Sequence, residues 1–169
     1  MTDEREGRLA RWIEQIEHNA FGAIYGAITV LALLMAMGHS ATDPITTAAI
    51  LFGSVLAITR AKAFAQISAD AAHHRAAFGW AEVRAGWRHA QPTLIAANIP
   101  TLLIALAATG AYSAETAIDL SQVFAILLLA VYGFSIGWVI YRRVLPGLLH
   151  GAFTGAIGLA LALLKFVLH

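Results

Sequence analysis

Long apolar runs without charged residues are the feature of this sequence that most restricts its fold. Only 12% of the residues are charged and 59% are hydrophobic, whereas a soluble domain carries about 25% charged residues. A helix needs about 20 mainly apolar residues to cross the hydrocarbon core of a bilayer. We therefore predict an all-α integral membrane bundle, and its expected partner is the lipid bilayer.

Five apolar runs predict five transmembrane helices, joined by short turns and one longer polar stretch. The expected segments are an amphipathic cytoplasmic helix over 1–19, a transmembrane hairpin over 20–67, a helical cytoplasmic insert over 68–91, a second transmembrane hairpin over 92–143 and a fifth transmembrane helix over 144–169. Nearly all Arg and Lys fall on one side of this arrangement. The positive-inside rule then predicts a cytoplasmic N-terminus and an outer C-terminus, in the plasma membrane of a bacterium.

Two further features of the composition exclude classes of function. The chain has no cysteine, which excludes disulfides and thiolate metal or redox chemistry. The net charge is +1 and the basic residues lie scattered between apolar runs. Because they form no basic patch, nucleic-acid binding is not expected.

The polar stretch from Arg60 to Gln91 holds the best candidate site. Asp70, His73 and His74 are three and four residues apart, so they share one face of a helix. Acid-x-x-His is the ligand spacing of di-iron bundles, and carboxylate with imidazole suits Fe, Mn or Zn. The alternative is a solvated helix surface. The further candidate ligands are Glu14, Glu17 and His18 of the N-terminal helix.

Three histidines begin outward-going helices at their cytoplasmic ends: His18, His89 and His150. If these helices are neighbours, the three imidazoles lie at similar depth and can bind a transition metal or relay protons. The alternative is that each is simply tolerated at the membrane interface.

The third apolar run contains Asn98 and Pro100. Proline inside a helix removes a backbone hydrogen bond and bends it, and an amide in lipid must find a partner within the bundle. Together they are candidates for a helix break on a transport pathway. The alternative for Asn98 is a plain hydrogen bond between helices.

The last apolar run carries Gly147, Gly151 and Gly155 at four-residue spacing. Small residues at this spacing let another helix approach closely, as in a glycine zipper. The spacing does not say whether that helix belongs to the same chain or to another, so a homo-oligomer, with a dimer as one form, is expected.

The order of these segments resembles that of the vacuolar iron transporter family: an amphipathic helix, two spans, a helical insert, two spans and a glycine-rich fifth span after a basic turn. The segment RVLPGLLHGAFTGA, from Arg143, is similar in style to that family's last helix. The resemblance implies a dimeric, proton-coupled exporter of Fe(II) or Mn(II), with acidic ligands in the insert and an Asp in the first span. Here Ala20–Met37 contains no acid and the insert is short.

These patterns leave two main hypotheses for the function. The first is a proton-coupled ion transporter for a divalent metal (Fe, Mn or Zn), or a metal-binding membrane protein. The second is an oligomeric channel or an accessory subunit of a membrane complex with no chemistry of its own. A membrane metalloenzyme or haem protein using the three interface histidines is disfavoured, because histidine-rich boxes are too few.

Overall fold

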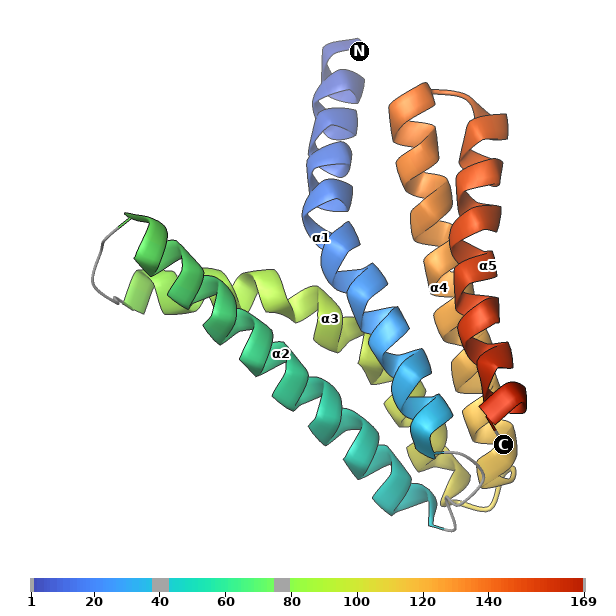
Figure 1. Cartoon of the computed structure of the whole chain (residues 1–169). Coiled ribbons are helices and arrows are strands. Elements are labelled where there is room, and N and C mark those ends of the chain that lie inside the picture. Colours follow the sequence, from blue (N-terminus) through green and yellow to red (C-terminus); the bar gives the residue numbers. More distant parts are fainter. Residues whose placement is uncertain (1, 38–42, 75–79, 169) are drawn as a thin grey trace.

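The computed structural model describes residues 2–37, 43–74 and 80–168 of the chain, which are helical apart from short turns and caps. These ranges contain no strand, so the all-α prediction is confirmed (Figure 1). The helices are α1 (Thr2–Met37), α2 (Pro44–His74), α3 (Trp80–Ala107), α4 (Ala114–Tyr141) and α5 (Val144–Leu168).

Four of these helices have a stretch long and apolar enough to cross a membrane: Ala20–Met37, Pro44–Ala69, Ala114–Tyr141 and Val144–Leu164. The apolar part of α3, Gln91–Ala107, is shorter and spans about 26 Å, which is near the lower limit for a crossing. Each of the five helices also exposes large apolar side chains on the outside of the bundle. Such a surface suits lipid rather than water, and the chain is a membrane-embedded protein.

The polar segments are extensions of the membrane helices rather than separate elements. The expected amphipathic helix over 1–19 and the first span form one helix of 36 residues. The insert expected over 68–91 consists, within the described residues, of the end of α2 and the start of α3. Both polar segments are thus continuous with apolar helix segments.

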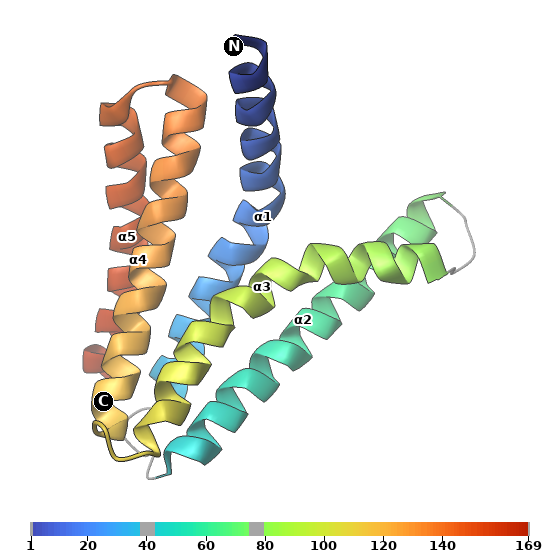
Figure 2. The ribbon, with the colours of Figure 1, turned by 180° about the vertical axis from the view of Figure 1, so that it is seen from behind.

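The helices form two groups that meet at α3. The first group is α1, α4 and α5, and the second is α2 with the first half of α3. Helices α4 and α5 lie antiparallel beside α1, while α2 and the first half of α3 lean away from them (Figures 1 and 2). The second half of α3 returns to pack against α1 and α4. The core between the helices is apolar, with Leu31, Leu51, Ile104 and Leu129 among its fully buried side chains.

Helix α1 meets α3 through small residues. A side chain added at Gly22 would come within 2.8 Å of Pro92, and one at Gly26 within 2.8 Å of the Thr93 carbonyl oxygen. The Thr93 hydroxyl donates to the Gly22 carbonyl oxygen at 3.1 Å in a buried position. The small-residue pair at 22 and 26 thus sets how closely the two helices approach.

Helices α4 and α5 are in similarly close contact. A Cβ atom at Gly151 would lie 2.8 Å from the Ala130 carbonyl oxygen, and one at Gly147 would lie 3.0 Å from the Phe134 ring. Gly155 has more room, with 3.3 Å to the Cβ of Ala130. The glycine-rich face of α5 therefore lies against α4 of the same chain.

Asp43 caps the first turn of α2. Its carboxylate accepts from the backbone N–H of Thr46 at 2.9 Å, from that of Ile45 at 3.4 Å and from the Thr46 hydroxyl. Pro44 occupies the first helical position, where its missing N–H costs nothing. The hydrogen bonds from the Thr46 side chain and then its backbone lower the pKa of Asp43.

We expect Asp43→Ala to lower the thermal midpoint of the detergent-solubilised protein at neutral pH, because α2 loses its cap. The folded pKa is the lower one, so the stabilisation is full above the unfolded value of about 3.9 and is lost as pH falls through the folded value. The difference between wild type and variant should therefore shrink below about pH 4. Asp43→Asn, which keeps an acceptor, should lie between the two; a difference that is constant from pH 7 to pH 3 would contradict the charge-assisted cap.

Candidate functional site

The proposed metal ligands fall on two helix extensions. Glu14, Glu17 and His18 belong to the part of α1 that precedes its apolar stretch, and Asp70, His73 and His74 belong to the last turns of α2. The helical backbone keeps the spacing that the sequence predicts, with members of each set one turn apart. The six side chains lie outside the described part of the structure.

The two ligand sets are not neighbours within one chain. The end of α2 leans away from α1 in both views (Figures 1 and 2), and α2 packs mainly against α3. Among the side chains that are described, no three His, Asp, Glu or Cys residues gather in a group that could hold a metal ion. Each extension therefore has to be considered as a site of its own.

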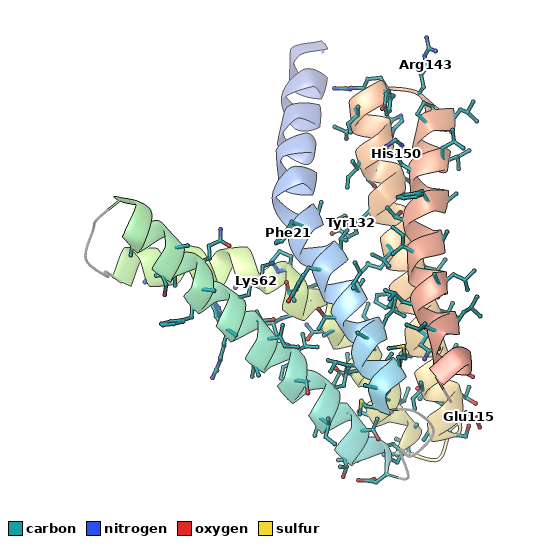
Figure 3. The ribbon with its side chains drawn as sticks, viewed as in Figure 1. Phe21, Lys62, Glu115, Tyr132, Arg143 and His150 are labelled. Atoms are coloured by element: carbon teal, nitrogen blue, oxygen red, sulfur yellow. The ribbon has the colours of Figure 1, made fainter. Side chains whose placement is uncertain are left out.

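Of the three interface histidines, only His150 has a described side chain; those of His18 and His89 lie outside the described residues. His150 Nδ1 is 3.0 Å from the Pro146 carbonyl oxygen, and its ring is tilted against Tyr141 at 5.6 Å between centroids. A carbonyl oxygen can only accept, so Nδ1 is the donor in this contact. Figure 3 shows His150 near the turn between α4 and α5.

The expected helix break is a bend. Helix α3 continues through Pro100, and its ribbon curves between its two halves (Figure 2). Ser121 of α4 donates to the Pro100 carbonyl oxygen at 3.3 Å and to the Ala117 carbonyl oxygen at 2.7 Å. The buried Pro100 thus packs against α4.

Asn98 does not face the bundle as the sequence analysis expected; its side chain is exposed. The described residues of α3 that are buried are mostly small and recur at helical spacing: Pro92, Thr93, Ala96, Ala97, Pro100, Ile104 and Ala107. Asn98 lies off this stripe, so the amide points outward from this chain. The spacing of the small residues was the signal that could have shown this.

Lys62 lies in a membrane span, and its charged side chain is not placed as the sequence would predict. A lysine near the end of a span is expected to extend to the headgroups. Instead its Nζ atom is buried, lies 4.0 Å from the centroid of the Phe21 ring and 4.6 Å from that of Tyr25, and has no hydrogen-bond partner among the described residues. Figure 3 shows Lys62 and Phe21 side by side between α1 and α2.

Thr59, one turn before Lys62 on α2, is also fully buried, and its hydroxyl has no hydrogen-bond partner among the described residues. Ionisable groups inside a membrane are costly and usually have a function. The junction of α1 and α2 is therefore the second candidate site, beside the two helix extensions. No pattern in the sequence pairs Lys62 with Phe21, because the pairing depends on how α2 crosses α1.

No protein-family model, curated protein or solved structure matches this chain.

Proposed function

We propose that this chain is a proton-coupled transporter of a divalent metal ion, with Fe, Mn and Zn as candidate cargo. The observation that carries the proposal is the continuity of α1 and α2, each of which runs without a break from a polar extension into a membrane span. All six candidate ligands lie on these two extensions. Binding of a cation to an extension would thus act on the span to which it is joined.

The distribution of charge supports an orientation with the N-terminus in the cytoplasm. Arg143 lies at the turn between α4 and α5, at the same end as the start of α1, and Glu115 lies at the opposite end (Figure 3). Arg142 and Arg143 follow α4, whereas at the other end Asp43 precedes α2 and Glu115 is in the first turn of α4. The positive-inside rule assigns the arginine-bearing end to the cytoplasm.

The ligand chemistry supports the coupling to protons. Carboxylate oxygens and neutral imidazoles suit hard or borderline divalent metals, and both must be deprotonated before they bind. Metal capture on Asp70, His73 and His74 would therefore release protons near neutral pH, where histidine titrates. Metal uptake should weaken as the pH on the extension side falls below about 6.

The test is metal binding and transport by the purified protein. We expect the double variant His73→Ala and His74→Ala to lose tenfold or more of its affinity for Fe(II), Mn(II) or Zn(II), on the order of what the loss of metal-site partners costs. Titration calorimetry would measure binding, and proteoliposomes loaded with a metal-sensitive dye would measure transport. Gln66→Ala, an exposed polar position of α2, is the matched control and should leave both unchanged.

Metal binding also distinguishes the transporter from the second hypothesis, which is an accessory or channel subunit without chemistry. Wild-type protein that binds no divalent metal but forms a defined oligomer in native mass spectrometry would support that hypothesis and reject metal transport. Because Gly147 and Gly151 already pack against α4, the oligomer would have to form through another surface. For the transporter we propose a homo-oligomer, and the same measurement gives its subunit number.

A further inference from the structure

We propose that Lys62, Phe21 and Tyr25 form a latch that holds α2 against α1, so that the angle between the two helix groups depends on a cation–π contact. The part of the molecule that the latch controls is here called the arm: α2 together with residues 80–91 of α3. This proposal concerns the conformation of the arm, and it does not require that the chain transports a metal.

The geometry of the contact is that of a cation over two aromatic faces. The rings of Phe21 and Tyr25 lie one turn apart on α1, 6.2 Å between centroids and with 22° between their planes. The Lys62 ammonium lies within 4.6 Å of both centroids, inside the range of about 6 Å for cation–π attraction. The attraction is strongest when the cation is removed from water, and the Nζ atom of Lys62 is buried.

The latch lies where α2 has few other contacts with the first group of helices. Among the described side chains, hydrogen bonds join neighbouring helices in three places: Thr93 to α1, Ser121 to α3 and Thr154 to α4. Helix α2 packs mainly against α3 and only slightly against α1. Since α2 and α1 diverge towards the polar end (Figure 1), a long lysine side chain is suited to bridge the widening gap.

Loss of the latch should release the arm. The absence of cysteine from the chain allows two spin labels to be attached at introduced cysteines, Gln66→Cys on the arm and Arg143→Cys at the turn after α4; both positions are exposed. Pulsed electron–electron double resonance in nanodiscs, without added metal, then measures the distance between the two spin labels. We expect Lys62→Met, which keeps an unbranched side chain one atom shorter and removes the charge, to broaden the distance distribution and add a longer-distance population.

Three companion variants identify the cause of the broadening. Lys62→Arg keeps a cation and should retain the wild-type distribution. The double variant Phe21→Leu and Tyr25→Leu keeps apolar side chains but removes the rings, and it should broaden the distribution as Lys62→Met does. Adding Lys62→Met to this double variant should cause no further change, because residues that act as one contact are not additive. Arg60→Met, an exposed charge two residues away, is the matched control and should leave the distribution unchanged.

Two results would overturn the latch. The first is a distribution for Lys62→Met that superimposes on that of the wild type. The second is the same broadening in Glu17→Gln, since a carboxylate one turn before Phe21 would then be the partner that holds Lys62. Size-exclusion chromatography of every variant verifies that the comparison is made on folded protein.

Discussion

Gly133→Leu is expected to separate α4 from α5 and to destabilise the protein more than any other substitution discussed here. A Cβ atom at Gly133 would overlap the Thr154 side chain and come within 2.8 Å of the His150 carbonyl oxygen. The carbonyl oxygen belongs to the backbone of α5 and cannot rotate away. The helices would have to move apart, which would also break the hydrogen bond from Thr154 to the Leu129 carbonyl oxygen at 3.0 Å.

We estimate the cost of this substitution at about 3 kcal/mol or more, at the upper end of overpacking in a close-packed interior. For a chain of this size that corresponds to a fall of roughly 10 °C in the thermal midpoint, measured by intrinsic fluorescence in detergent. Gly53→Leu is the matched control, because a Cβ atom at Gly53 would have nothing within 4 Å. Its midpoint should stay close to that of the wild type. Equal losses in the two variants would mean that the α4–α5 contact is not the cause.

The second large effect is expected at the crossing of α1 and α3, in Gly26→Leu. A Cβ atom there would lie 2.8 Å from the Thr93 carbonyl oxygen and 2.9 Å from the Cβ atom of Ala96. Separation of the helices would also break the buried hydrogen bond from Thr93 to the Gly22 carbonyl oxygen. We expect a loss of about 3 kcal/mol, and the same fluorescence measurement checks it.

The two glycine variants differ in their expected effect on the arm. Helix α3 connects the arm to α1, so Gly26→Leu should broaden the distance distribution between labels at positions 66 and 143. Gly133→Leu acts within the other group of helices and should change mainly the thermal midpoint. If Gly26→Leu left both measurements at wild-type values, the described contact between α1 and α3 would be wrong.

The helices were predictable from the sequence because hydrophobic length and turn residues act locally. The apolar runs and Pro44 at the start of α2 indicate helix positions. The start of α4 lies earlier than its apolar run indicates, because Ser113 caps the helix by accepting from the Thr116 N–H at 3.1 Å. The small-residue pair Gly22 and Gly26 favours a close helix approach but does not name α3 as the partner. Partner choice depends on how the helices cross, and no local pattern encodes that.

The candidate sites were less predictable for the same reason. The i, i+3 and i, i+4 spacing of Asp70, His73 and His74 describes one helix and says nothing about its neighbours. The divergence of α2 from α1 keeps this set apart from the α1 set (Figure 1). Lys62 is the clearest example, since its burial against Phe21 results from the tilt between two helices.

Helix α3 is shared by both helix groups, which has a mechanical consequence. It is bent along its length and carries Pro92 and Pro100, and at Pro100 the Ser121 hydroxyl holds it to α4. Because the two halves of α3 are one continuous helix, a movement of its first half would apply a force to the second half. A swing of α2 would therefore reach α4 mainly through α3, against which both helices pack.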